Sequence, residues 1–228
     1  MIQTNCLSKC YDSAQVLRDV TIQIKKHELA VIHGAYDSGK STLLRCLSGL
    51  EEITHGSLEV NGITVDADMD SSMKYERMRQ IRGRVSMVTM PCQLHPKKTA
   101  ISNVIEPLFS LKHLNKLDAI ELGSQMLDKV GMYDRRYAYP CCLTGSQPLR
   151  IMIARALAMN PDLLMIDETA SWNDEIISQQ LTKLISGLAQ EGLTIVVAMS
   201  DIDKARKLSD RIYYLSEGTL SLIQNYQN

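Results

Sequence analysis

The chain has 228 residues, 45% of them hydrophobic, and its 25 Lys and Arg nearly balance 26 Asp and Glu, for a formal net charge of -1. Such a chain is typical of one globular unit without the basic surface that nucleic acids or anionic membranes attract. The sequence contains no apolar run near the ~20 residues of a membrane span and no signal peptide at its start, so we expect a cytosolic protein.

The six cysteines do not form a recognisable binding pattern. They are Cys6, Cys10, Cys46, Cys92, Cys141 and Cys142. None belongs to a pair of matched C-x-x-C elements, as a zinc site would require. We therefore interpret them as reduced thiols rather than as a disulfide framework or metal ligands.

The first third of the chain predicts strands. Residues 16–24 and 58–65 alternate apolar and polar side chains, and Asn61-Gly62 is a turn signal within the second segment. The run "LAVIH" at 29–33 is typical of a short buried strand. These patterns indicate an antiparallel β region around a first core strand.

Helical spacing dominates the middle of the chain, and strands alternate with helices after it. The helical patterns cover 101–114, 116–132 and 148–160, followed by strands at 163–167, 194–199 and 211–215 with helices at 174–190 and 201–210 between them. Short all-apolar strands separated by helices indicate a parallel sheet covered on both faces. The sequence therefore predicts an α/β fold.

Residues 34–41, "GAYDSGKS", match the phosphate-binding pattern G-x-x-x-x-G-K-[ST]. Gly34 and Gly39 allow a tight turn whose N–H groups converge on phosphate oxygens, at the positive end of the following helix. Lys40 would reach the terminal phosphates, and the Ser41 hydroxyl would bind Mg²⁺. We assign the other residues of this loop to nucleotide binding as well: Ala35, Tyr36, Asp37, Ser38 and Thr42.

A second pair of carboxylates supports the nucleotide site. The apolar run "LLMI" ends in Asp167-Glu168, as in a strand that delivers an acid to the Mg²⁺ beside a phosphate loop. Asp167 would hold the metal through a water. Glu168 would then be free to polarise the attacking water as a general base.

With these motifs in this order, the chain resembles the nucleotide-binding subunits of ATP-binding cassette transporters over nearly its whole length. The most specific block is 139–171, where a signature loop, a helix, the strand before Asp167 and a D-loop follow one another. The form of "VNGITVD" and the short length look most like subunits of bacterial polar amino-acid importers. The resemblance implies a P-loop NTPase with a RecA-like parallel core, an N-terminal antiparallel β region and an inserted helical subdomain. The single domain would divide into a nucleotide-binding core at 1–90 and 160–228 and a helical subdomain at 91–159 that carries the signature loop.

The resemblance also implies a mechanism and partners. Two subunits, identical or different, would sandwich two ATP molecules with Mg²⁺, docked on an integral-membrane permease at the inner face of the cell membrane. Tyr11 stands where the family stacks an aromatic ring on adenine, and Asp174 at the D-loop aspartate. The signature positions that would contact the partner's nucleotide are Thr144, Gly145, Ser146 and Gln147. Nucleic acid is not an expected partner.

The sequence departs from the family at several catalytic positions. Met90 stands where a glutamine usually ligates Mg²⁺ and positions water, and Gln93 follows three residues late. Ser200 occupies the position of a histidine that contacts the γ-phosphate. Ser146 adds a side chain where a signature glycine permits close phosphate approach. Together these changes are expected to slow hydrolysis more than binding, because the phosphate loop is intact.

The residues leave more than one function open. The chain is either an ATPase subunit that drives solute import through a permease, or a hydrolysis-impaired module that dimerises on ATP and regulates a more competent partner. A soluble P-loop kinase is the weakest interpretation, since nothing in a kinase calls for the "LTGSQ" block upstream of Asp167.

Overall fold

The computed structural model describes residues 1–89, 93–167, 174–209 and 211–223, which build two sheets. The first sheet is antiparallel, with strand order β2-β1-β5-β6 and β3 paired to β1. Its strands are β1 (Ile2–Tyr11), β2 (Ala14–Val20), β3 (Gln23–Ile24), β5 (His55–Val60) and β6 (Ile63–Asp66). The sheet is the predicted antiparallel region.

The second sheet has the order β11-β10-β4-β9-β8-β7, and all its neighbouring strands are parallel except β10 and β11. Its strands are β4 (Leu29–His33), β7 (Val85–Val88), β8 (Leu163–Ile166), β9 (Thr194–Met199), β10 (Arg211–Ser216) and β11 (Thr219–Ile223). Strands distant in the chain thus become neighbours, and β9 lies between β4 and β8.

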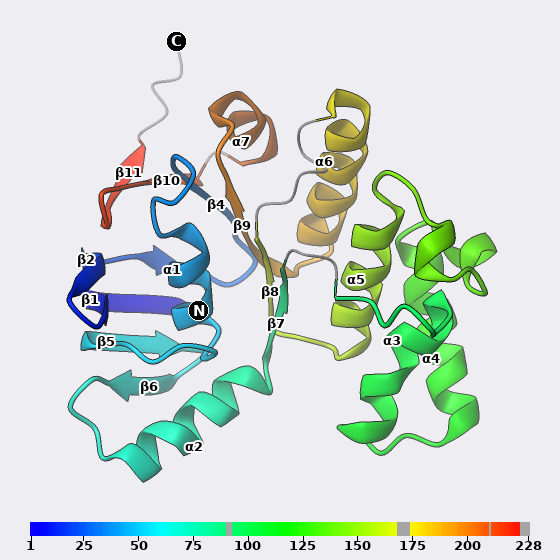
Figure 1. The fold of residues 1–228 in the computed structure, drawn as a ribbon, viewed down its shortest axis with the longest axis horizontal. Helices are drawn as coiled ribbons and strands as arrows, with labels where there is room; N and C mark the ends of the chain where they lie inside the picture. The colour runs from blue at the N-terminus through cyan, green and yellow to red at the C-terminus, as the bar shows by residue number, and fades with distance from the viewer. Residues whose placement is uncertain (90–92, 168–173, 210, 224–228) are drawn as a thin grey trace.

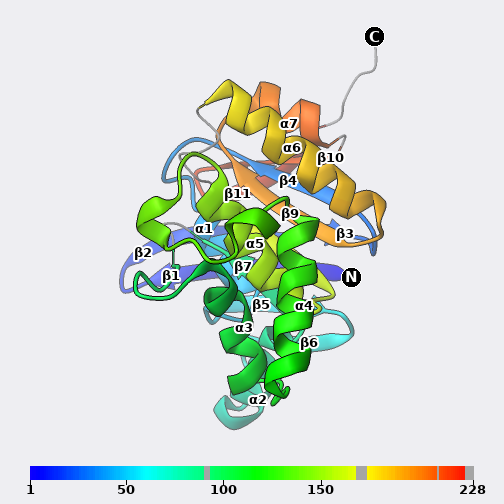
Figure 2. The ribbon, with the colours of Figure 1, turned by 90° about the vertical axis from the view of Figure 1, so that its right-hand side faces the viewer.

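Helices cover both faces of the six-stranded sheet (Figure 1). They are α1 (Lys40–Leu47), α2 (Ser71–Arg82), α3 (Ala100–Ser110), α4 (Lys116–Lys129), α5 (Gln147–Ala158), α6 (Glu175–Gln190) and α7 (Ile202–Leu208), with single 3₁₀ turns η1 (Tyr133–Arg135) and η2 (Pro140–Cys142). Helices α3, α4 and α5 form a group on the side away from the antiparallel sheet (Figures 1 and 2). Within the described ranges, every helix is too short or too polar to cross a membrane.

Two apolar cores lie on opposite faces of the six-stranded sheet. In β4, Ala30 and Ile32 face the core that contains α1 and the antiparallel sheet, whereas Val31 faces the core built with α3 to α7. Because successive side chains of a strand point to opposite faces, a strand that is apolar throughout must be covered on both sides. The expected doubly covered sheet is confirmed.

The predicted hairpin turn is present, but three elements were not predicted. Asn61 and Gly62 both have positive φ, 55° and 79°, as a two-residue hairpin turn between β5 and β6 requires. The sequence patterns did not identify β1, α2 or β11. In β1 the pairing register shifts between Asn5 and Ser8, and this irregularity interrupts the alternation by which strands are recognised.

Two helical glycines are expected to respond in opposite ways to Ala. A Cβ at Gly187 in α6 would meet nothing within 4 Å, so Gly187→Ala should stabilise the protein by about 1 kcal/mol through helix propensity. A Cβ at Gly123 in α4 would lie 2.4 Å from Ile105 Cγ2 and 3.0 Å from Ile101 Cδ1 of α3. That overpacking should cost about 1–3 kcal/mol and outweigh the propensity gain. Urea denaturation measures the change in the free energy of unfolding for both variants. Equal stabilisation by the two substitutions would contradict the packing of α4 on α3.

Candidate functional site

The carboxyl ends of three neighbouring parallel strands bring the predicted site residues together. Gly34 follows β4, Asp167 follows β8, and Ser200 follows β9, which lies between them. The Gly34 N–H donates to the Met199 carbonyl at the end of β9, 3.3 Å away. Gly34 therefore lies at the same edge of the sheet as Asp167 and Ser200, although more than a hundred positions of the chain separate it from them. Ligands bind at this edge in open α/β folds.

Two positions of the phosphate loop, Gly34 and Gly39, do not accommodate a side chain without strain. A Cβ at Gly34 would lie 2.3 Å from the Leu215 carbonyl oxygen, and Gly39 has a φ of 99°. Asp37 also adopts a positive φ, 59°. The loop closes with the Ser38 N–H donating to the Ala35 carbonyl at 3.3 Å, and α1 begins at Lys40. The first N–H groups of an α-helix have no partner within the helix, so this end of α1 suits an anion.

The Lys40 side chain lies inside the loop and not in solvent. It is only 5% exposed, and its Nζ donates to the carbonyls of Gly34 at 2.9 Å and Ala35 at 2.7 Å. The ammonium is thus already placed at the turn where phosphate oxygens are expected. By contrast, Tyr36 projects outward with 85% of its surface exposed.

Ser41 and Asp167 meet across the sheet edge. The Ser41 hydroxyl donates to Asp167 Oδ1 at 3.0 Å, and Asp167 is only 6% exposed. A hydroxyl and a buried carboxylate are hard oxygen donors of the kind that Mg²⁺ prefers. In the part of the chain that the structure describes, the buried Ser38 hydroxyl has no hydrogen-bond partner, which leaves a donor for a phosphate oxygen. The residues present therefore fit a magnesium nucleotide.

Tyr11 lies at the end of β1, on the hairpin that borders the phosphate loop. The ring is 39% exposed, and Lys9 Nζ lies 4.7 Å from its centroid. In the same hairpin, Val16 lies beside the loop: a Cβ at Gly39 would be 3.3 Å from Val16 Cγ1. Pattern analysis overlooked Val16, because one apolar residue in an alternating strand carries no sign of a ligand.

The predicted signature residues form the turn that leads into α5. The Thr144 N–H donates to Gln147 Oε1 and the Gln147 N–H to the Thr144 carbonyl, both at 3.1 Å, and Gly145 has a φ of 56°. The Ser146 side chain does not project outward as expected from a residue that crowds phosphate. It is 6% exposed, and its hydroxyl accepts from Arg150 Nε at 3.2 Å. Arg150 was missed, although its spacing of four residues from Ser146 in a helical pattern could have revealed it.

Some predicted residues lie outside the described ranges or have a visible structural role. Met90 and Glu168 lie outside the residues that the structure describes. Asp174 is the N-cap of α6, where its carboxylate accepts from the Ile177 N–H at 2.9 Å. Gln93 Nε2 donates to Thr89 Oγ1 at 3.1 Å, so its amide lies beside the end of β7, near the sheet edge.

Ser200 is exposed at the carboxyl end of β9, two residues before α7 begins at Ile202. Asp201 caps this helix by accepting from the N–H groups of Asp203 at 3.0 Å and Lys204 at 3.1 Å. The hydrogen bond from the Lys204 N–H lowers the pKa of Asp201, so the carboxylate stays charged beside Ser200. Ser200 is thus held between a core strand and a capped helix.

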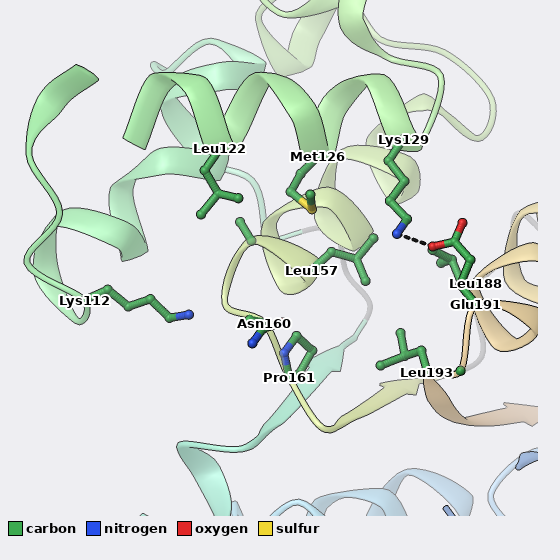
Figure 3. A pocket seen from close by; sticks show the side chains of 12 residues that line it. Lys112, Leu122, Met126, Lys129, Leu157, Asn160, Pro161, Leu188, Glu191 and Leu193 are labelled. Atoms are coloured by element: carbon green, nitrogen blue, oxygen red, sulfur yellow. Dashed lines mark ion pairs between the residues drawn. The ribbon is translucent and has the colours of Figure 1, made fainter. Parts of the chain in front are cut away.

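A cavity of about 390 Å³ lies elsewhere, between α4 and the ends of α5 and α6 (Figure 3). Pro161 and Leu193, which line it, precede the amino ends of β8 and β9, whereas the phosphate loop follows a carboxyl end. Lys129 and Glu191 form an ion pair at its rim. This cavity is therefore separate from the predicted nucleotide site.

Residues 17–171 match the family model described as ABC transporter. The chain belongs to the ABC transporter family. It is an ATP-binding cassette with the P-loop NTPase fold. This confirms the resemblance inferred from the phosphate loop and the signature block.

Curated relatives align along almost the whole cassette. The glutamine transport ATP-binding protein GlnQ of Escherichia coli (strain K12) is 37% identical over 222 residues, covering 97% of this chain and 90% of the relative. The histidine/lysine/arginine/ornithine transport ATP-binding protein HisP of Salmonella typhimurium is 36% identical over 220 residues, covering 94% and 85%. The cassette thus spans most of each relative.

Solved cassettes share its architecture. The dimeric post-hydrolysis structure of the ATP-binding cassette MJ0796 bound to ADP and Pi has a TM-score of 0.84 and 27% identity, covering 99% of this chain and 100% of that chain. A second dimeric structure of MJ0796, described as a bacterial ABC transporter cassette, has a TM-score of 0.83 and 28% identity, with the same coverage. This chain and the solved cassettes therefore share the fold over almost their whole length.

Asp174 offers a test that separates helix capping from charge. Asp174→Ala removes the acceptor for the Ile177 N–H and should cost about 1 kcal/mol of the free energy of unfolding, whereas Asp174→Asn should cost less than about 0.5 kcal/mol, since Asn caps as well as Asp. Urea denaturation gives both values. Nucleotide titrations on the two variants then show whether the charge has a further role. Equal stability of Asp174→Ala and the parent protein would contradict the cap.

Proposed function

We propose that this cassette binds MgATP between two subunits and hydrolyses it to drive amino-acid import through a separate integral-membrane permease. The observation that carries the proposal is the full-length similarity to GlnQ and HisP, whose names assign them to glutamine and to histidine/lysine/arginine/ornithine transport. The permease, and not the cassette, would select the solute in this architecture. The cassette itself would lie on the inner face of the cell membrane, held there by the permease.

The phosphate loop supports the binding half of this proposal. Lys40 lies within the loop and would bind the terminal phosphates, together with the N–H groups at the start of α1 and the Ser38 hydroxyl. Ser41 and Asp167 would hold Mg²⁺, which when bound neutralises phosphate charge. Tyr11 would stack on adenine at the open end of the β1–β2 hairpin.

The hydrolytic half requires a base and a partner subunit. Glu168, directly after Asp167, would take the proton of the attacking water. Thr144 and the backbone of Gly145 would contact the nucleotide of the other subunit, since the signature turn begins a helix and its Thr side chain is exposed. The inward orientation of Ser146 favours this contact, because its side chain is hydrogen-bonded to Arg150.

The helical segment 91–159 would be a subdomain between the nucleotide core and the permease. Its helices α3 and α4 lie at the side of the molecule away from the antiparallel sheet (Figure 1). Leu94 is buried in the core, whereas Phe109 and Leu111 at the end of α3 are 38% and 68% exposed. We propose that the exposed part of residues 93–115 receives the permease.

A specific observation supports a second candidate function. Ser200 is exposed at the position where the family has a histidine that contacts the γ-phosphate. The serine side chain is shorter than histidine, so its hydroxyl would not reach as far as an imidazole ring. Loss of one preorganised donor at a developing charge typically slows a reaction about 10²–10³-fold. With Met90 also replacing a Mg²⁺-ligating glutamine, the cassette would then be a nucleotide-dependent dimerisation or regulatory module.

Phosphate release from Mg-ATP tests the ATPase directly. Glu168→Gln should reduce turnover by at least about 10²-fold while keeping nucleotide binding, because only the proton acceptor is lost. Lys40→Ala should weaken nucleotide binding itself. Binding is measured separately by titration with a fluorescent ATP analogue, and removal of Mg²⁺ with a chelator should abolish turnover. Turnover that is unchanged in Glu168→Gln would contradict the assignment of the base.

Restoring the family residues distinguishes the two functions. If catalysis is impaired only by the missing donors, Ser200→His combined with Met90→Gln should raise phosphate release by about 10²-fold or more over the parent protein. Glu168→Gln in that background serves as the matched inactive control. A fully active parent protein that gains nothing from these substitutions would rule out the regulatory module.

A further inference from the structure

Two neighbouring cysteines occupy an exposed turn directly before the signature residues. Cys141 and Cys142 form the last two positions of η2, both side chains are exposed, and their sulfur atoms lie 3.8 Å apart. Leu143 and Thr144 follow at once. The proposed ATPase mechanism uses neither thiol, so these two reactive groups have no role in it.

The environment of this pair differs from that of a cysteine in the core. Burial raises the pKa of the Cys46 thiol to about 12, and such a thiol stays protonated and unreactive. At the exposed pair, the hydrogen bond to Cys141 raises the pKa of Cys142. The two exposed sulfur atoms lie 3.8 Å apart, so once one of them carries a mixed disulfide the other is close enough to act as the resolving thiol.

We propose that Cys141 and Cys142 form a reversible vicinal disulfide that switches the signature loop, with a low-molecular-weight disulfide as the oxidant. In the first step the Cys141 thiolate attacks one sulfur of that molecule, forming a mixed disulfide and releasing one thiolate. Cys142 then loses its proton, and its sulfur attacks Cys141 Sγ, releasing the second thiol. The protein loses two protons and two electrons, and the small disulfide gains them and becomes two thiols.

This bond must change the backbone on which the signature turn is built. The Cα atoms of adjacent residues lie about 3.8 Å apart across a trans peptide, closer than the ~4.4–6.8 Å usual in disulfides. The turn is held by the Cys142 N–H donating to the Tyr139 carbonyl at 2.9 Å and the Leu143 N–H donating to the Pro140 carbonyl at 3.1 Å. Closing the ring therefore strains the turn that positions Thr144.

Formation of the bond and its effect on the loop do not depend on the proposed function, whereas the effect on ATP turnover does. The experiment uses the full chain with Cys6, Cys10 and Cys92 changed to Ser and with the buried Cys46 kept. Among the residues that the structure describes, Cys141 and Cys142 are then the only exposed thiols. Oxidised glutathione is added, and the product is alkylated and analysed by intact mass and peptide mapping. We expect a loss of two hydrogens and no alkylation at either residue, reversed by dithiothreitol.

The matched control is Cys142→Ser in the same background, which should stop at one bound glutathione because the resolving thiol is gone. Amide hydrogen exchange then measures whether oxidation changes the backbone hydrogen bonds of the turn. The amides of Cys142 and Leu143 should exchange about fivefold faster after oxidation, as expected when one backbone hydrogen bond of ordinary net strength is lost. Cys141→Ser with Cys142→Ser should show no change on oxidation.

Two results would overturn the switch: a mixed disulfide that persists on the intact pair, or a vicinal disulfide that leaves exchange across 139–147 unchanged. Phosphate release is measured on the same samples and should fall on oxidation. If the reduced protein releases no phosphate, the proposed ATPase fails, while mass and exchange still decide the disulfide.

Discussion

The hydrogen bond from Ser41 to Asp167 joins the two halves of the nucleotide site. It connects the first turn of α1 to the end of β8, across the strand β9 that separates β8 from β4. A bond at this position requires the parallel strand order, the turn of the phosphate loop and the start of α1 to be correct together. The same geometry would let one Mg²⁺ reach both oxygens. The proposed site therefore depends on the sheet topology as a whole and not on any single motif.

The positions proposed for nucleotide binding and those proposed for catalysis differ in how tightly the fold constrains them. Binding depends on a backbone that other residues constrain, as at Gly34, where a side chain would collide with the Leu215 carbonyl. Ser200, at a position proposed for catalysis, is exposed at the end of β9, where the core constrains the side chain less. Gln93 donates to Thr89 near the same edge, which leaves an amide beside the carboxyl end of β7. Loss of rate can therefore accumulate without loss of fold.

The sequence patterns predicted the parallel sheet and the phosphate loop well, because buried strands and glycine turns leave strong signals. Helix α2 was missed since only Met78 and Ile81 of its residues are buried, too few to produce a clear apolar stripe. Edge strand β11 alternates polar and apolar residues, but the alternation covers only 219–222 and none of its side chains is fully buried. The orientation of Ser146 could not be read from its position in the signature block, because it depends on Arg150 one turn later in α5. Three-dimensional partners, rather than local propensity, decide these cases.

Helix α1 is enclosed between two sheets, and that enclosure sets the order in which parts of the molecule can open. Its side chains Leu43, Leu44 and Leu47 are fully buried in the core shared with the antiparallel sheet. Helix α4 packs mainly on α3 and α5, and it contacts the central sheet less directly. Sub-global unfolding should therefore release α4 at a lower free energy than α1, since only Ala119, Gly123 and Leu127 of its fourteen residues are buried. The proposed nucleotide-binding helix α1 should therefore remain folded when the outer helix α4 opens.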